Sequence, residues 1–175
     1  MSLVSAATRA EESVSDIPLC QLLSDPGAYD HKLMRVTGKV SRGFEDFTLQ
    51  DQSCPEDKTL TTVWLEYGGP EPAAVVYCCE ATDGPSRPNG KDPLRVDGIE
   101  TSLLRDAMFK KFERLTTHLK RGETVPVTLM GRYFAGEKVE LPDGRTSWED
   151  FGHLGIASLF VIQQVIDLDQ AISLS

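Results

Sequence analysis

The most regular pattern of apolar and polar positions lies in residues 33–41. Met34, Val36 and Val40 alternate with polar residues, which is the period of two shown by a strand with one buried face. Gly38 falls in the apolar row, and a glycine inside a strand marks a bulge, a bend or a close backbone approach. A second short strand follows after a glycine turn. The pattern therefore predicts a hairpin whose first strand is strongly bent, as small closed barrels require.

Three later segments carry the same kind of pattern. They are residues 61–67, 124–134 and 157–168, which we predict as the third, fourth and fifth strands. In the fourth strand Gly131 occupies the apolar row, as Gly38 does in the first strand. This repetition predicts two equivalent bends, one in each strand.

Two helices are predicted from apolar spacing and capping residues. A short helix, capped by Ser15 or Asp16, is expected to end at Asp25, which precedes a Pro-Gly pair. A long helix, capped by Thr101 or the serine after it, is expected to end before Gly122. Its apolar face recurs at intervals of three and four and consists of Leu104, Met108, Phe112, Leu115 and Leu119.

The chain is long enough for one domain with a substantial core. It has 175 residues, of which 40% are hydrophobic and 26% are charged. We expect a flexible N-terminal segment over residues 1–14 and a single domain over residues 15–170. Residues 68–100 hold five of the ten prolines, which predicts a long loop insertion with one short strand at 73–79. No apolar run reaches the roughly eighteen residues of a membrane span, so no span is expected.

The predicted order is three strands, one helix and two strands, preceded by a short helix. This order, with a bent first strand, resembles the OB-fold, a five-stranded barrel. The chain also resembles a family of small uncharacterised bacterial OB-like proteins, over most of residues 17–167. The residues that carry this resemblance are Leu19-Cys20-Gln21-Leu22-Leu23, Tyr29-Asp30, Val36-Thr37-Gly38, Gly43-Phe44-Glu45, Asp51, Cys54-Pro55, Trp64-Leu65 and Phe151-Gly152-His153-Leu154-Gly155. The resemblance implies a mainly β barrel, often made with an export leader, and no assigned activity.

The N-terminus bears on the compartment in which the protein acts. Residues 1–15 have neither a basic start nor an apolar stretch, so no secretory signal is present as written. Two interpretations remain open. The protein is cytoplasmic, or it is an exported, periplasmic protein whose leader has been removed.

The four cysteines are Cys20, Cys54, Cys78 and Cys79. They form no Cys-x-x-Cys pair and have no histidine at ligand spacing, so no metal site is expected. A disulfide between Cys20 and Cys54 would close a loop of about 35 residues and add roughly 3 to 4 kcal/mol of stability. The alternative is that Cys20 is a buried free thiol. The spacing alone leaves both open.

The charge balance bears on the partner. The chain has 27 acidic and 18 basic residues and a net charge of -9, whereas a nucleic-acid binder needs an excess of Lys and Arg to neutralise phosphates. Nucleic acid is therefore disfavoured. The one basic cluster lies on the long helix, where Lys110, Lys111 and Arg114 are candidates for binding an anion or an RNA backbone. The alternative is an ordinary solvated helix surface.

Four aromatic residues fall on the second and third strands or beside them, where OB barrels bind oligonucleotides and oligosaccharides. These candidate ligand-binding residues are Phe44, Phe47, Trp64 and Tyr67. Trp64 has two interpretations. It covers the barrel from outside, or it is an exposed platform on which a ring or base stacks.

A second candidate site is the segment from Trp148 to residue 155. Glu149, Asp150 and His153 lie within five residues, a density that could serve acid–base chemistry or hold one metal ion. The alternative is that the glycines shape a turn and His153 hydrogen-bonds a neighbouring backbone group. The chain has no Walker loop, dinucleotide fingerprint, Gly-x-Ser-x-Gly or His-Glu-x-x-His motif.

These observations favour a non-catalytic OB-like module that binds a protein, a peptide or a small ligand such as a glycan. Single-stranded nucleic acid is the alternative ligand, and a metal-dependent hydrolase centred on His153 is the second alternative. No cofactor is predicted.

Overall fold

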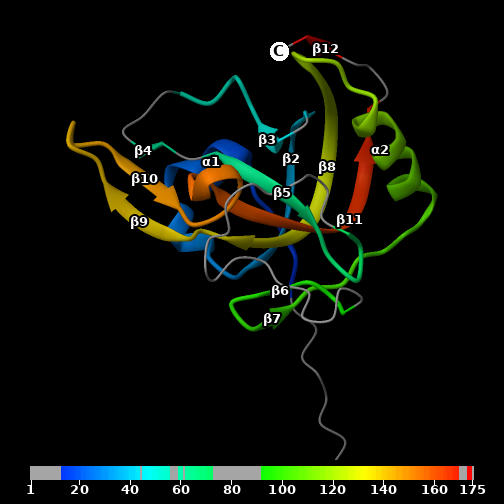
Figure 1. Ribbon diagram of the computed structural model, residues 1–175, viewed down its shortest axis with the longest axis horizontal. Coiled ribbons are helices and arrows are strands. Elements are labelled where there is room, and N and C mark those ends of the chain that lie inside the picture. The colour runs from blue at the N-terminus through cyan, green and yellow to red at the C-terminus, as the bar shows by residue number, and fades with distance from the viewer. Residues whose placement is uncertain are drawn as a thin grey trace, which may run out of the picture.

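The computed structural model places five strands in a closed barrel (Figure 1). It describes residues 13–43, 45–55, 59–60, 62–72, 92–169 and 173–174. The barrel strands are β2 (Leu33–Arg42), β3 (Phe47–Gln50), β5 (Val63–Tyr67), β11 (Ser158–Leu168) and β8 (Glu123–Phe134). They follow the order β2–β3–β5–β11–β8, and β8 also pairs with β2 to close the barrel. The pair β5–β11 is parallel and the other barrel pairs are antiparallel. The predicted mainly β, OB-like barrel is confirmed.

Smaller elements surround the barrel. They are β1 (Ser15–Asp16), α1 (Leu19–Ser24), β4 (Thr59–Leu60), β6 (Arg95–Val96), β7 (Ile99–Glu100), α2 (Ala107–Thr117), β9 (Glu137–Glu140), β10 (Thr146–Glu149) and β12 (Ser173–Leu174), with short 3-10 turns at Pro26–Tyr29 and His153–Gly155. A separate sheet, β4–β10–β9, projects from the barrel between β8 and β11 (Figure 1).

The two mid-strand glycines have different packing surroundings. In the β2–β8 register Met34 faces Gly131 and Gly38 faces Val127. A Cβ at Gly131 would collide with the carbonyl oxygen of Val161 and lie 2.6 Å from the Phe160 ring. At Gly38 the nearest atom would be a methyl group of the Leu49 side chain, 2.9 Å away. Close backbone packing therefore requires glycine at Gly131 more strictly than at Gly38.

Substitution of each glycine by alanine is expected to show how strictly each position requires glycine. Gly131→Ala should lower the free energy of unfolding by about 2 to 3 kcal/mol, because a carbonyl oxygen cannot move aside as a methyl can. Gly38→Ala should cost less than about 1 kcal/mol, since the side chain of Leu49 can adjust and alanine reduces the entropy of the unfolded chain. Urea denaturation of both variants measures the difference. Equal losses would contradict this distinction.

Helix α2 packs against one end of the barrel. Phe109 and Phe112 are fully buried there. The Phe47 ring lies edge-on to the Tyr67 ring, with centroids 5.5 Å apart, and Tyr67 lies edge-on to Phe109 at 5.2 Å. The aromatic contacts join the helix to β3 and β5, so this end of the barrel is closed by side chains.

Both helices are shorter than predicted. Helix α2 begins after Asp106, whose side chain accepts a hydrogen bond of 2.8 Å from the backbone N–H of Phe109. The residues before it stay extended because the N–H of Leu104 donates to the carbonyl of Gln163 in β11. Leu104 is accordingly exposed rather than part of a packed helix face. Helix α1 begins at Leu19, and the expected capping residues form β1, which pairs in parallel with β2.

The two ends of the predicted insertion are fixed to the barrel. The N–H of Gly68 donates to the carbonyl of Ile162, and the N–H of Gly69 donates to the carbonyl of Thr101. Leu94 in turn donates to the carbonyl of Gly69 and is fully buried. The predicted strand at 73–79 and most of the predicted N-terminal segment lie outside the described residues. In the part of the chain that the structure describes, no helix is long and apolar enough to cross a membrane.

Candidate functional site

Three of the four aromatic residues proposed as ligand contacts belong to the core. Phe47 is fully buried, and Tyr67 and Trp64 are 3% and 4% exposed. The exposed-platform interpretation of Trp64 is therefore wrong, and so is the expectation that Phe47 and Tyr67 are surface contacts. The physical reason is long-range packing, which the local strand pattern does not contain. Phe44 lies outside the described residues.

The outer face of the third barrel strand is closed as well. Trp64 faces Leu159 and Glu66 faces Val161 in the parallel β5–β11 register, and all four are buried. Gly152 packs so closely on the Trp64 ring that a Cβ there would lie 2.7 Å from Cε3. OB barrels bind oligonucleotides on this face. In this chain the packed side chains leave no open aromatic surface on β5.

Arg42 belongs to the closed end of the barrel rather than to an open anion site. Its guanidinium donates to the Tyr67 hydroxyl at 3.1 Å and to the Thr117 hydroxyl at 3.3 Å, and its centre lies 5.0 Å from the Phe47 ring. Burial raises the pKa of Tyr67 to about 12, and the neighbouring positive charge of Arg42 opposes that shift. The phenol therefore stays protonated at neutral pH and serves packing.

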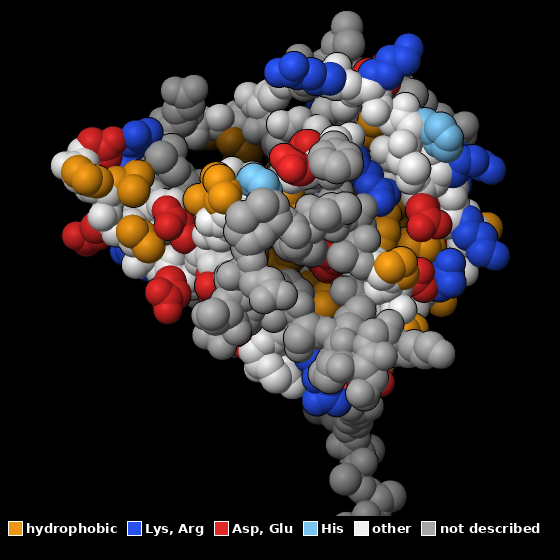
Figure 2. Space-filling model, viewed as in Figure 1, with side chains coloured by type: hydrophobic (Ala, Val, Ile, Leu, Met, Phe, Trp, Pro, Cys, Tyr) orange, Lys and Arg blue, Asp and Glu red, His pale blue; other side chains and the backbone are white. Residues whose placement is uncertain are grey.

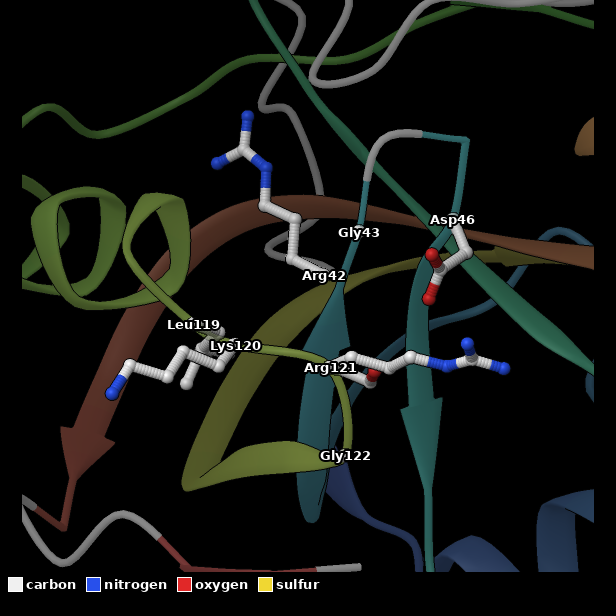
Figure 3. A pocket seen from close by; sticks show the side chains of 8 residues that line it. Arg42, Gly43, Asp46, Leu119, Lys120, Arg121 and Gly122 are labelled. Atoms are coloured by element: carbon white, nitrogen blue, oxygen red, sulfur yellow. The ribbon is translucent and has the colours of Figure 1, made fainter.

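A cleft of about 380 Å³ lies between the β2–β3 turn and the segment after α2. Arg42, Lys120, Arg121 and Asp46 are among its lining residues. Figure 3 shows that the three cationic side chains point in different directions, and that Asp46 lies beside the cleft. A phosphate site requires several cationic groups that converge on one point, and these charges do not converge.

The three predicted anion-binding residues lie on the outside of α2. Lys110 and Arg114 are exposed, and Lys111 is half-buried. None of the three lines the cleft described above. Their geometry matches an ordinary solvated helix face.

Trp148 and His153, the two candidate residues of the second predicted site, lie in different surroundings. Trp148 is half-buried and packs against Gly27, where a Cβ would lie 2.7 Å from Cη2 of the indole. His153 is half-buried and its Nδ1 atom is buried without a hydrogen-bond partner among the described residues. No hydrogen bond described for this segment links the imidazole to Glu149 or Asp150. Among the described residues, the only group of ligand atoms close enough to hold one metal ion is Cys20, Asp51 and Cys54, and His153 is not part of it.

The turn over residues 150–157 presents two large aliphatic side chains that the sequence reasoning did not single out. Leu154 is 60% exposed and Ile156 is 58% exposed. The turn is held by hydrogen bonds from the N–H of Asp150 to the carbonyl of Gly155 at 2.8 Å, and between Phe151 and Ala157 at 3.0 Å in both directions. The signal in the sequence was leucine and isoleucine around a glycine, where a surface turn normally carries polar residues.

Leu154 adopts a backbone conformation that leucine normally avoids. Its φ angle is 62°, and the left-handed region costs a residue with a Cβ about 1 to 2 kcal/mol. Such strain persists where surrounding structure imposes it, and it clusters at functional sites. The backbone hydrogen bonds of the turn impose it here.

The β9–β10 hairpin that leads into the turn carries an acidic pair, with the exposed Lys138 next to it in β9. Glu137 and Glu149 lie directly opposite each other in the β9–β10 register, where like charges are unfavourable. Hydrophobic and acidic side chains lie together over the β9–β10 hairpin (Figure 2). Glu149 directly precedes Asp150, whose N–H bonds to Gly155 within the turn. We call Leu154 and Ile156, together with this acidic pair at the base of the turn, the turn surface.

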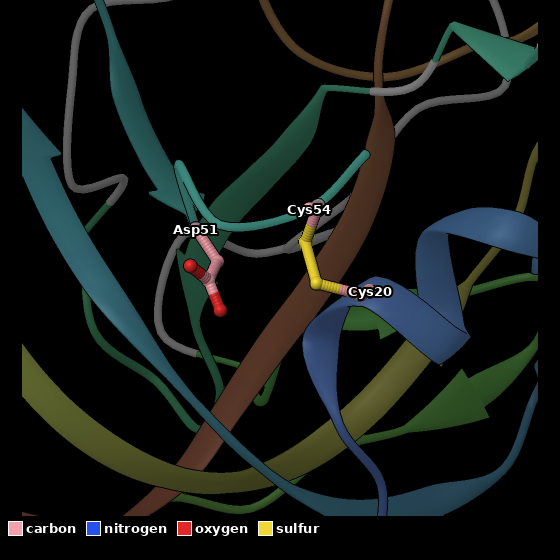
Figure 4. A group of neighbouring side chains, drawn as sticks. All are labelled: Cys20, Asp51 and Cys54. Carbon is pink, nitrogen blue, oxygen red and sulfur yellow. A yellow bond between two sulfur atoms is a disulfide. The ribbon is translucent and has the colours of Figure 1, made fainter. Parts of the chain in front are cut away.

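Of the two interpretations of Cys20, the structure shows the disulfide. Cys20 of α1 and Cys54 of the loop after β3 are bonded, with their Cα atoms 5.0 Å apart (Figure 4). The bond joins residues separated by 34 positions and ties α1 to the barrel.

Fold and site together define a closed, disulfide-bonded barrel of the OB-like class with an exposed aliphatic turn. No protein-family model, curated protein or solved structure matches this chain. A barrel of this class supports many activities, so function has to be argued from the turn surface and not from the fold.

Proposed function

We propose that this protein is a non-catalytic interaction module that binds a partner protein or peptide through the turn surface. The observation that carries the proposal is the exposure of Leu154 and Ile156 on a turn held by backbone hydrogen bonds. Two large aliphatic side chains on a rigid turn lose little conformational entropy when they are covered, which favours binding.

The charge around the turn indicates the chemistry of the partner. Glu137 and Glu149 face each other without an ion pair among the described residues. A basic group beside an apolar contact would relieve their repulsion and would be attracted to the acidic chain. A partner segment with aliphatic and basic side chains therefore fits the turn surface best.

We also propose that the protein acts in an oxidising compartment. A disulfide within the chain supports export, because disulfides persist outside the reducing cytoplasm. The alternative of single-stranded nucleic acid has less support, since the outer face of β5 is buried and the cationic side chains diverge.

Site-specific photocrosslinking in the native host tests the proposal. A benzoylphenylalanine residue at position 156 is expected to give one discrete adduct on irradiation. The same residue at position 104 is the matched control, because Leu104 is 51% exposed and is bonded to Gln163 in the middle of β11, whereas the turn precedes β11. No adduct at position 156, or the same adducts at both positions, would contradict the proposal.

A pair of substitutions measures how much the two side chains contribute. Leu154→Asn with Ile156→Asn should weaken binding of the crosslinked partner at least tenfold, because both apolar contacts are lost. Their thermal unfolding should stay close to that of the wild type, because exposed substitutions rarely change stability by more than about 0.5 kcal/mol and asparagine tolerates the left-handed conformation. Unchanged affinity in the folded variant would exclude the turn as the contact.

A further inference from the structure

The loop that holds the disulfide also places a carboxylate beside it. Asp51 follows β3, and the ligand atoms of Asp51, Cys20 and Cys54 all lie within 4.8 Å of one another. Figure 4 shows the three side chains grouped between α1 and the loop. All three residues are half-buried, so solvent and ions can reach the group.

The carboxylate of Asp51 is oriented by the loop itself. Oδ1 accepts hydrogen bonds from the backbone N–H of Ser53 at 2.9 Å and from its hydroxyl at 2.8 Å. These bonds hold the pKa of Asp51 below its usual value, and the positive charge of Lys39 lowers it further. Both hydrogen bonds use Oδ1, so the loop fixes the orientation of the carboxylate through one of its two oxygens.

We propose that reduction of the Cys20–Cys54 disulfide creates a site for a zinc-like divalent cation, with the two thiolates and a carboxylate oxygen of Asp51 as ligands. The same position is then cross-linked by the disulfide under oxidising conditions and by the metal under reducing conditions.

The geometry of zinc supports this assignment. Zn–S distances of about 2.3 Å and Zn–O distances of about 2.1 Å place tetrahedral ligand atoms about 3.6 to 3.8 Å apart. Once the covalent bond is broken, small side-chain rotations can reach such separations from Cα atoms 5.0 Å apart. The backbone need not move far, because the buried side chains of Leu19 and Leu22 hold α1 against the barrel independently of the disulfide.

The ligand types also select the metal. Two thiolates and one carboxylate suit Zn²⁺ or Cd²⁺ and disfavour Mg²⁺ and Ca²⁺, which prefer oxygen ligands. A fourth position is left for water, as in zinc sites with three protein ligands. Ser53 is not a ligand, but its hydrogen bonds to Oδ1 orient the carboxylate of Asp51.

A phosphine serves as the reductant that opens the disulfide. The disulfide gains two electrons and two protons and becomes two thiols, while the phosphine becomes its oxide with oxygen from water. The cation then replaces both thiol protons, which pass to solvent. Metal binding is therefore expected to strengthen as pH rises, since protons and metal compete for the sulfurs.

Cadmium titration of the full-length chain tests the proposal. Cys78→Ser and Cys79→Ser are included in every sample so that the other two cysteines cannot bind the probe. The reduced protein, freed of phosphine by gel filtration without oxygen, should bind one Cd²⁺ with thiolate-to-cadmium ultraviolet absorption. The oxidised protein should show no such absorption. Competition with a chromogenic chelator then measures Zn²⁺ affinity.

Two single variants test the carboxylate. Asp51→Asn should weaken Zn²⁺ binding by the reduced protein at least tenfold, whereas Asp25→Asn should leave it unchanged. Asp25 is the matched control because it is an exposed aspartate at the end of α1. Equal affinity in Asp51→Asn would overturn the three-ligand assignment.

Circular dichroism of the same samples separates metal binding from loss of fold. The reduced protein should be folded with Zn²⁺ present. A folded reduced protein that binds no stoichiometric metal would overturn the proposal. A reduced protein that stays unfolded after Zn²⁺ is added would overturn it as well.

Discussion

Loss of the Cys20–Cys54 disulfide is expected to lower the free energy of unfolding by about 3 to 4 kcal/mol. The bond closes a loop between residues 34 positions apart, and without it the unfolded chain regains the entropy of that loop. The buried side chains of Leu19 and Leu22 keep α1 on the barrel in the folded protein, so the loss acts mainly on the unfolded chain. An effect of this size is a large share of the stability of a small domain.

Urea denaturation of Cys20→Ser with Cys54→Ser measures this loss. Cys78→Ser and Cys79→Ser are present in both proteins that are compared. The reference protein carries only these two substitutions and keeps the disulfide, so the two proteins differ only at Cys20 and Cys54. Serine cannot bind the cation proposed above with comparable affinity, so trace metal does not mask the result. An unchanged denaturation midpoint would show that the disulfide does not stabilise the fold.

Truncation of Phe112 to alanine is expected to cost about 3 to 5 kcal/mol. Phe112 is fully buried, and its ring centroid lies 6.3 Å from that of Phe47. Removing the ring leaves a cavity where α2 meets the end of the barrel. Alanine is a good helix former, so the loss reports packing and not helix propensity.

Lys110→Ala is the matched control for Phe112→Ala. Lys110 is exposed on the same helix, and its truncation should change stability by no more than about 0.5 kcal/mol. Urea denaturation of the two variants, followed by circular dichroism, gives both values. Similar small losses in both would mean that α2 contributes little to the closure of the barrel.

Several features of the fold could be predicted from local pattern. Alternating apolar residues located β2 and β8 closely, because the two faces of a strand follow directly from a period of two. The pairing of Cys20 with Cys54 was one of two interpretations that the spacing left open, and the structure decided it. The start of α2 was placed too early, since apolar spacing alone does not reveal that Leu104 bonds to Gln163.

The candidate site was much harder to predict. The aromatic residues were selected because OB barrels use that region, yet Trp64 is covered by Gly152 and is 4% exposed. The segment near His153 was selected for its titratable groups. Within that segment, the structure presents Leu154 and Ile156 at the surface instead.

The sequence by itself determined the strand alternation and the acidic balance, because each depends on the residue types of a short segment or of the whole composition. The tertiary structure alone decided which side of β5 is covered, where α2 begins, which aliphatic side chains stay exposed and that Asp51 lies beside the disulfide. Each of these depends on contacts between residues far apart in the chain, and a local pattern contains no information about such contacts.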